Sequence, residues 1–330
     1  MNPAILELAT RQYGITQSDL QSLTGGHFSY VFEFTKNGQD LVLRITPPNQ
    51  DVDLLSTKAI LAWMDYLGRH RAAVTRPVPS GDGNLIEIAT IDSDMYLCVV
   101  YEKAHGALAE TLSFDQWNGR LFEKLGRAVG RMHALARRYR TAEIALARPS
   151  WDQITNCFNP GYGLDPSQAA ILKRKTEIMQ FVQALPRLPG DYGLIHADLH
   201  LGNIMVDLPE KAVTILDFDD CCYGWYAMDI VMTLFDFLVV YPVEDKASFA
   251  GNFLADYLKG YRQETDLSRF SIEHLPHFLK LLEIGIYTQV YRSYLAGQAD
   301  AWVKKYMAGR TERIERGIPY VELDLSDYSR

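Results

Sequence analysis

One stretch of the chain, residues 195–220, restricts the possible folds and functions more than any other. It reads IHADLHLGNIMVDLPEKAVTILDFDD, in which two short apolar runs, 203–206 and 213–216, flank a turn that contains Pro209. Such β-branched runs around a turn predict a β-hairpin. A hairpin returns the chain to its starting point, so the polar residues before the first run and after the second should meet at one end.

The polar residues at this end of the predicted hairpin are carboxylates, imidazoles and one amide. They are His196, Asp198, His200 and Asn203 before the hairpin, and Asp217, Asp219 and Asp220 after it. Carboxylates gathered in a small volume repel one another and lose hydration unless a cation or a hydrogen-bond network compensates. The sequence therefore predicts a functional site here rather than a purely structural turn.

Composition and charge exclude several classes of protein. With 330 residues the chain is long enough for two lobes, and its formal net charge of −8 argues against nucleic-acid binding. Its four cysteines form no disulfide framework, which is typical of the reducing cytoplasm. The N-terminal stretch does not resemble a signal peptide, and the apolar run at 230–241 is too short to span a bilayer. We expect a cytoplasmic protein that binds neither membranes nor nucleic acids; the sequence does not indicate its oligomeric state.

The hydrophobic periodicity changes along the chain and separates a β-rich part from a helical part. The first part should contain a helix at 2–13, a Gly25-Gly26 turn, strands at 30–34, 41–45, 84–91 and 95–101, and a helix at 52–70. The second should contain helices at 113–139, 167–185, 225–241, 245–262, 271–296 and 298–314. We therefore expect an α+β fold with a small β-rich N-lobe, residues 1–103, and a larger helical C-lobe, residues 104–330, that carries the hairpin.

The spacing of the polar residues is typical of one reaction. Asn203 follows Asp198 by five residues, and Asp217 comes fourteen residues later. This order matches the catalytic loop and metal-binding segment used for phosphoryl transfer from ATP. Asp198 would orient an acceptor hydroxyl and take its proton, and Asn203 and Asp217 would supply the hard oxygen ligands that Mg²⁺ prefers. His196 would hold the loop by hydrogen bonds to backbone carbonyls.

Several further motifs accompany this site: the strand LVLRI, the segment VVYEKAHG, the helix segment GRMHAL, and YGWYAMDI after the hairpin. Together with IHADLHLGNI and LDFDD, they make the chain resemble the aminoglycoside phosphotransferase and choline kinase superfamily. The resemblance covers most of the chain and implies a two-lobed fold similar to that of protein kinases, with ATP and Mg²⁺ in the cleft. It also implies structural roles for Asp229, which anchors the catalytic loop, and for His133.

The same resemblance implies a nucleotide-binding set in the N-lobe. Gly25 and Gly26 would approach the phosphates, and the backbone from Glu102 to Ala104 would contact the adenine. Arg44 stands where the family has a phosphate-binding lysine, and still offers a positive fork for phosphate oxygens. The usual glutamate partner of that lysine aligns with Ile60, so the expected ion pair is absent or made by another acid.

The acceptor implied by the resemblance is a hydroxyl group of a small molecule: homoserine, choline or another amino alcohol, or an aminoglycoside. The LVLRI and LDFDD motifs are most similar to the homoserine kinase branch, which is the first expectation. A Ser/Thr protein kinase of the same superfamily is one alternative. A weakly catalytic nucleotide-binding regulator, motivated by Arg44 and Ile60, and a zinc hydrolase, motivated by the H-x-D-x-H pattern, are the others.

Aromatic side chains of the C-lobe, including Trp225, Tyr226 and Tyr287, admit two interpretations. They either wall a pocket for a cationic substrate through cation–π contacts or, as is commoner at helical spacing, form core. Glu283 and Arg292 lie on the same predicted helix as some of these aromatics and are candidates for recognising an amine or an amino acid.

Overall fold

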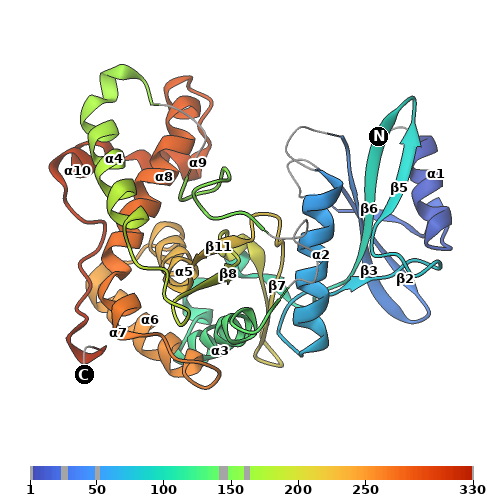
Figure 1. Cartoon of the computed structure of the whole chain (residues 1–330), viewed down its shortest axis with the longest axis horizontal. Coiled ribbons are helices and arrows are strands. Elements are labelled where there is room, and N and C mark those ends of the chain that lie inside the picture. The colour runs from blue at the N-terminus through green and yellow to red at the C-terminus, as the bar shows by residue number, and fades with distance from the viewer. Residues whose placement is uncertain (1–2, 24–28, 49–52, 141–147, 160–163, 329–330) are drawn as a thin grey trace. The chain divides into compact units, whose positions relative to one another are not determined.

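The computed structural model describes residues 3–23, 29–48, 53–140, 148–159 and 164–328. By their internal contacts these residues fall into two compact units, Met1–His105 with Arg140–Ala147, and Gly106–Tyr139 with Arg148–Arg330. The first unit holds an antiparallel sheet with two main helices and the second is mainly helical (Figure 1), which confirms the predicted α+β class. Within the described residues, no helix is sufficiently long and apolar to cross a membrane.

The sheet of the first unit has the strand order β1-β2-β3-β6-β4, and β5 also pairs with β6. The strands are β1 (Gln21–Ser22), β2 (Tyr30–Lys36), β3 (Gln39–Thr46), β4 (Pro77–Val78), β5 (Glu87–Ile91) and β6 (Asp94–Glu102). β2 and β3 form a hairpin around Asn37 and Gly38, whose φ angles of 53° and 76° are those of a two-residue turn that suits strand twist.

The core of the first unit follows from the alternation along β3. Leu41, Leu43 and Ile45 point to one face and pack on Ile5 and Ala9 of α1 (Pro3–Gln12). The second helix, α2 (Leu54–Arg69), begins at Asp53, whose carboxylate accepts a hydrogen bond from the Ser56 amide at 2.7 Å. Figure 1 shows α1 and α2 on different sides of the strands.

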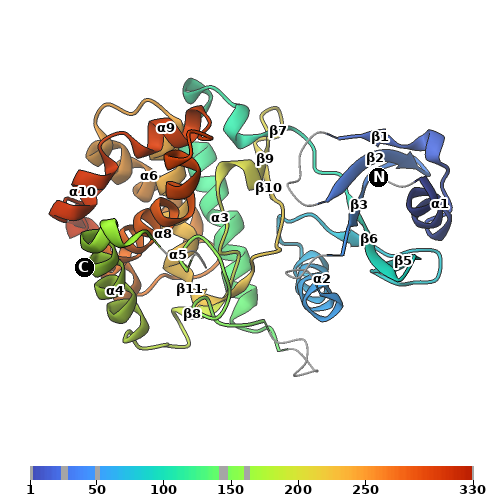
Figure 2. The same cartoon turned by 90° about the horizontal axis from the view of Figure 1, so that it is seen from above.

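The second unit is built around α5 (Tyr226–Val240), of which nearly every side chain is buried. The other helices are α3 (Gly119–Ala136), α4 (Ala169–Gln183), α6 (Lys246–Tyr261), α7 (Arg269–Glu273), α8 (Leu275–Leu295), α9 (Ala301–Met307) and α10 (Arg310–Arg316). Figure 2 shows α5 enclosed by other helices of this unit, in keeping with its lack of an exposed face. A helix that is apolar all round belongs in the core.

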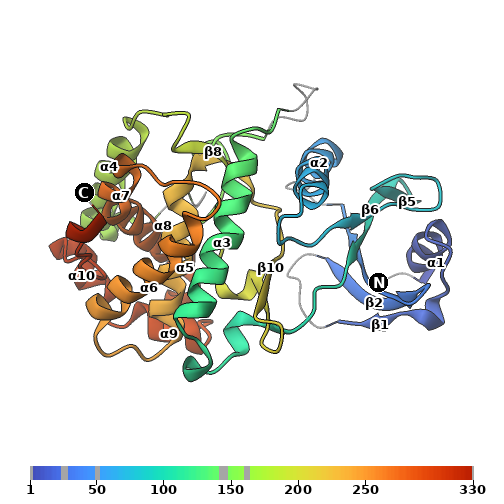
Figure 3. The same cartoon turned by 90° about the horizontal axis from the view of Figure 1, so that it is seen from below.

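Glycines bring α3 and α6 into close contact, and the two helices run side by side in Figure 3. A Cβ atom at Gly126 would lie 1.9 Å from the carbonyl oxygen of Tyr257, and one at Gly260 would lie 1.8 Å from that of Glu123. Any larger residue would force the backbones apart, so these positions fix the separation of the two helices.

The predicted hairpin of residues 203–216 is confirmed as β9 (Ile204–Asp207) and β10 (Ala212–Ile215), with Ile204 opposite Ile215. A short strand, β7 (Ala107–Leu108), extends it on the β9 side. The sequence pattern did not indicate a second ribbon, in which β8 (Tyr192–Ile195) pairs with β11 (Cys222–Trp225). β8 ends directly before the predicted catalytic loop, and β11 begins just after the acidic segment 217–220. Their pairing therefore brings the loop and the acidic segment close together.

Three predicted helices are interrupted. The stretch 113–139 begins with a 3₁₀ turn at Phe114–Gln116, and α3 starts only after Asn118, whose side chain accepts from the amides of Arg120 and Leu121. The stretch 271–296 divides into α7 and α8 at His274, because Pro276 suits only a first turn. The stretch 298–314 divides into α9 and α10 at Gly309, whose φ of 66° ends a helix.

Candidate active site

The predicted catalytic loop, residues 196–203, is attached to α5 through a buried carboxylate. Asp229, which is fully buried, accepts hydrogen bonds from the amides of His196 at 2.9 Å and Ala197 at 2.8 Å. His133 of α3 contacts the same carboxylate through Nε2 at 3.0 Å. Ala197 has a φ of 66°, a left-handed conformation that is strained for a side chain other than glycine and needs such support.

Two further residues on the same face of α5 continue this attachment, one and two turns along the helix. The Thr233 hydroxyl donates to the carbonyl of Leu199 at 2.9 Å. Asp236 accepts from the amide of Leu201 at 2.7 Å. Residues 229, 233 and 236 therefore form one helical stripe that holds the loop along its length.

His196 connects the loop to the residue that follows the second strand of the hairpin. Its Nε2 contacts the carbonyl oxygen of Leu216 at 2.7 Å, and its Nδ1 accepts from the amide of Asp198 at 3.3 Å. This pairing requires the proton on Nε2. The buried imidazole thus fixes Leu216, the residue before Asp217, relative to Asp198. This contact with a backbone carbonyl agrees with the loop-holding role predicted for His196.

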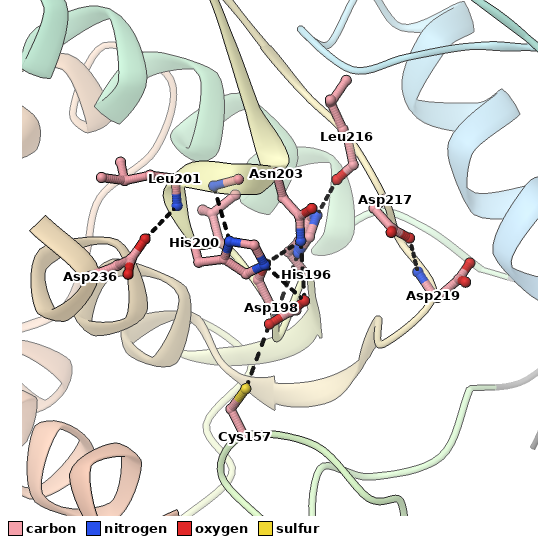
Figure 4. A network of polar contacts seen from close by, with 12 residues as sticks. Cys157, His196, Asp198, His200, Leu201, Asn203, Leu216, Asp217, Asp219 and Asp236 are labelled. Carbon is pink, nitrogen blue, oxygen red and sulfur yellow. Dashed lines mark hydrogen bonds and ion pairs between the residues drawn. The ribbon is translucent and has the colours of Figure 1, made fainter. Parts of the chain in front are cut away.

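The two carboxylate oxygens of Asp198 have different partners (Figure 4). Oδ2 accepts from Nδ2 of Asn203 at 3.1 Å and lies 3.5 Å from Nε2 of His200, whereas Oδ1 is contacted by the thiol of Cys157 at 3.6 Å. Burial disfavours the charged carboxylate, but the hydrogen bond from His200 opposes it and the pKa of Asp198 is lowered. The group is therefore ionised, as a proton acceptor must be.

His200 is a polar support of the loop. Its Nδ1 accepts from the amide of Gly202 at 3.0 Å and caps the short 3₁₀ turn Leu201–Asn203. With Nδ1 as acceptor the imidazole is the neutral tautomer whose proton is on Nε2, 3.5 Å from the Asp198 carboxylate. His200 therefore acts as a donor to Asp198 rather than as a metal ligand.

The two residues predicted to hold a metal lie at the same, open end of the hairpin, one before β9 and one after β10, and are joined through its backbone. The amide of Leu216 donates to the carbonyl of Asn203 at 2.8 Å. Because Nδ2 of Asn203 donates to Asp198, its Oδ1 is left with no hydrogen bond to any described residue. Asp217 has a φ of 52°, and its Oδ1 accepts from the amide of Asp219 at 3.4 Å.

The charge of this segment also fits a cation. Burial, with the negative charges of Asp198, Asp219 and Asp217, raises the pKa of Asp220 to about 7. Arg148 offsets part of that charge and holds the segment by donating to the carbonyls of Cys221 at 2.6 Å and Asp219 at 3.0 Å. An amide oxygen and an aspartate beside a concentration of negative charge form a donor set suited to Mg²⁺.

The described side chains do not provide a set of ligands suited to zinc. Among them no group of three or more histidine, cysteine, aspartate or glutamate residues is arranged to hold a metal ion. The H-x-D-x-H pattern instead resolves into separate contacts, with His196 on a backbone carbonyl and His200 on Asp198.

The predicted nucleotide-binding residues lie in the first unit. Arg44 of β3 donates through Nε to the Ser29 hydroxyl at 3.1 Å, while Ile60 is buried in α2 among apolar side chains. At the end of β6, the amide of Glu102 donates to Arg76, and among the described residues the amide of Ala104 has no backbone partner. Gly25 and Gly26 lie outside the described residues.

Two features of the second unit differ from the sequence-based predictions or were not predicted, and a third, the aromatic set, agrees with the commoner of its two interpretations. Cys157 reaches Asp198 across 41 positions of sequence, and no motif indicated this. Glu283, a candidate for amine recognition, is instead buried in an ion pair with Arg310, with Nη1 and Oε1 2.6 Å apart. The aromatic residues Trp225, Tyr226 and Tyr287 are also fully buried, so they form core rather than a pocket wall.

The site and fold define a phosphotransferase class, and the comparisons with known proteins agree. The sequence profile of the phosphotransferase enzyme family matches residues 19–267. The chain therefore belongs to this family, within the aminoglycoside phosphotransferase and choline kinase superfamily that the motifs indicated. It is a small-molecule phosphotransferase with an alcohol group as acceptor.

Individual relatives match the whole chain. The amicoumacin kinase of Bacillus subtilis (strain 168) is 30% identical over 326 residues, which cover 98% of this chain and 94% of that protein. The solved amicoumacin kinase hAmiN, in complex with AMP-PNP, Ca²⁺ and Ami, is 31% identical with a TM-score of 0.88 and covers 99% of this chain and 97% of its own.

A more distant structure shares the fold. The microcompartment-associated aminopropanol kinase is 22% identical with a TM-score of 0.72, and the match covers 99% of each chain. Together the comparisons confirm the predicted superfamily and kinase class and support ATP with a divalent cation; they favour a kinase over the zinc-hydrolase and regulator alternatives.

Proposed function

We propose that this protein transfers the γ-phosphoryl group of ATP to a hydroxyl group of amicoumacin, with Mg²⁺ as the metal ion. Full-length similarity to two amicoumacin kinases, at 30% and 31% identity, carries the choice of acceptor. It ranks amicoumacin above the homoserine that the motifs first favoured. Homoserine, choline, aminopropanol and an aminoglycoside remain the comparison acceptors.

In this proposal Asp198 is the catalytic residue. Its Oδ1 accepts the proton of the acceptor hydroxyl as the hydroxyl oxygen forms a bond to the γ-phosphorus. The bond between the γ-phosphorus and the β–γ bridging oxygen breaks, and ADP leaves. His200 and Asn203 hold Oδ2 of the same carboxylate and so orient the reacting oxygen.

Asn203 and Asp217 would hold Mg²⁺, which neutralises phosphate charge when bound. The unengaged Oδ1 of Asn203 and the concentration of aspartates support this assignment. Arg44, Gly25 and Gly26 would contact the phosphates, and the backbone from Glu102 to Ala104 the adenine. The amide of Ala104, which has no backbone partner among the residues that the structure describes, supports the last of these.

The test measures ADP release with Mg²⁺ and ATP against the panel of acceptors, for the wild type and Asp198→Asn. We expect turnover on amicoumacin, and a loss of about 10²–10⁴-fold in kcat for Asp198→Asn because the general base is removed. Nucleotide binding by isothermal titration calorimetry should be retained. Preference for another acceptor would overturn the amicoumacin assignment, and full turnover by Asp198→Asn would overturn the role of Asp198.

A further inference from the structure

The partners of Asp198 leave only one of its oxygens for a substrate. Oδ2 accepts from Asn203 and lies beside the donor Nε2 of His200, so its lone pairs are directed at the protein. Oδ1 faces the other way in Figure 4 and has a single partner among the described side chains, the thiol of Cys157 at 3.6 Å. A thiol is a weak hydrogen-bond donor that an alcohol readily displaces.

Hydrogen bonds hold the segment that carries Cys157 in place, so the fold itself positions the thiol beside Asp198. Buried Asn156 donates through Nδ2 to the carbonyl of Trp151 at 2.8 Å, and its Oδ1 accepts from the amides of Phe158 at 2.8 Å and Asn159 at 2.9 Å. The amide of Trp151 in turn donates to the carbonyl of Tyr223 in β11 at 2.8 Å.

A glycine of α8 allows this segment to sit where it does. A Cβ atom at Gly285 would lie 1.9 Å from the carbonyl oxygen of Cys157, so only glycine permits the close approach. The flanking side chains of Trp151 and Phe158 are fully buried, whereas Cys157 itself is half-buried. The thiol is therefore held against Asp198 by contacts that involve neither the nucleotide-binding residues nor the hairpin.

We propose that Cys157 forms one wall of the acceptor subsite, where the reacting hydroxyl binds Oδ1 of Asp198 in contact with the thiol. The inference rests on the proposed function, because it takes Asp198 as the base. Cys157 is then a specificity-determining residue: its size and polarity decide which alcohols fit between the thiol and the carboxylate.

The thiol stays protonated in this position. Burial, with the charges of Asp198 and Asp220 and the hydrogen bond to Asp198, raises the pKa of Cys157 well above its usual range. The thiol therefore donates to Oδ1 in the absence of acceptor and does not compete with Asp198 as a base.

The first test compares acceptor and ATP kinetics of Cys157→Val and Cys157→Ser, with amicoumacin as acceptor. Valine adds bulk and lacks a donor, and we expect acceptor KM to rise about tenfold while the KM for ATP changes less than twofold. Serine donates more strongly to Oδ1 and competes with the acceptor, so acceptor KM should rise several-fold. Cys98→Ala, in β6 of the first unit, is the matched control and should leave acceptor KM unchanged.

A second test does not depend on the identity of the acceptor. The other cysteines, Cys98, Cys221 and Cys222, are buried, so N-ethylmaleimide should label Cys157 selectively, as mass spectrometry can show. Asp198→Asn removes the carboxylate that holds the thiol proton, and labelling at pH 8 should become about tenfold faster. Acceptor should slow the labelling of wild type, whereas AMP-PNP should not.

The two tests separate the inference from the proposed function. If wild type phosphorylates no acceptor of the panel, the proposed function fails while the labelling comparison still decides the contact between Cys157 and Asp198. Equal labelling rates in wild type and Asp198→Asn overturn the inference. A change in the KM for ATP with an unchanged acceptor KM overturns it as well.

Discussion

At position 200 one side chain both caps a turn and faces the carboxylate of Asp198, and the two roles can be separated by substitution. Nδ1 of His200 caps the 3₁₀ turn by accepting from the amide of Gly202, and Nε2 lies beside the carboxylate of Asp198. Asparagine is a preferred capping residue, but its side chain is too short to replace the donor Nε2 beside Asp198. His200→Asn should therefore preserve the turn while removing the main interaction that stabilises ionised Asp198.

The consequence is a shift in the pH dependence of catalysis. The hydrogen bond from His200 helps to lower the pKa of Asp198, so in wild type Asp198 stays ionised and kcat falls only when the pH drops below the usual aspartate range. In His200→Asn the hydrogen bond that offsets the burial of Asp198 is lost, so the pKa of Asp198 rises. The acid limb of the pH–kcat profile should therefore move to higher pH. Steady-state rates measured from pH 3 to 8 compare the acid limbs of the two proteins.

His70→Gln, at an exposed histidine after α2, is the control and should leave the profile unchanged. An acid limb at the same pH in His200→Asn and wild type would show that His200 does not tune Asp198. Loss of secondary structure in the circular dichroism spectrum of His200→Asn would show that Asn fails to replace the cap.

At the scale of elements, α5 acts as the scaffold for the catalytic loop. Asp229→Ala leaves two backbone amides and Nε2 of His133 without their acceptor in a fully buried position. Removing one member of a buried charged network typically costs about 3–5 kcal/mol. We expect a loss of that size in the free energy of unfolding, measured by urea denaturation.

Tryptophan fluorescence suits this measurement, because four of the five tryptophans, all but Trp63, lie in the second unit. The control is Asp245→Ala, which removes an exposed aspartate that caps α6 through the Ser248 amide at 3.0 Å. Loss of such a cap costs about 1 kcal/mol. Equal losses for the two variants would mean that Asp229 is no more than an ordinary cap.

Sequence patterns predicted the elements whose signals are local. The hairpin β9–β10 follows from two β-branched runs and a turn, and the order of Asp198, Asn203 and Asp217 follows from loop spacing. The ribbon β8–β11 was missed because its strands are four residues long and their paired residues lie at least 27 positions apart, so neither shows a period of its own. The breaks at Asn118 and Gly309 were missed because apolar periodicity continues across them.

For the whole molecule, the least predictable features are contacts between segments far apart in sequence. Glu283 and Arg292 share a helix in the sequence, but Glu283 proved to be half of a buried pair with Arg310, which also packs on the ring of Tyr320 at 4.1 Å. The contact of Cys157 with Asp198 depends on Asn156, Gly285 and β11 together. No local pattern contains that information, because packing alone decides it.

Binding of nucleotide and metal should raise the stability of the whole protein, which provides a test of the metal ligands that does not depend on the acceptor. A ligand present at 100 times its Kd stabilises the folded state by about 2.7 kcal/mol. AMP-PNP with Mg²⁺ should therefore raise Tm by several degrees in differential scanning fluorimetry, and EDTA should remove most of the increase. Asp217→Asn replaces a metal-binding carboxylate by a neutral amide.

The expected result is that Asp217→Asn loses the Mg²⁺-dependent part of the Tm increase and keeps the part due to AMP-PNP alone. Removing one of several crowded carboxylates also relieves the repulsion that raises the pKa of Asp220. The ligand-free variant should accordingly be no less stable than wild type, so a smaller Tm increase cannot be attributed to misfolding. Asp245→Asn should behave as wild type throughout. A full Mg²⁺-dependent increase in Asp217→Asn would exclude Asp217 as a metal ligand and direct the search to Asp219 or Asp220.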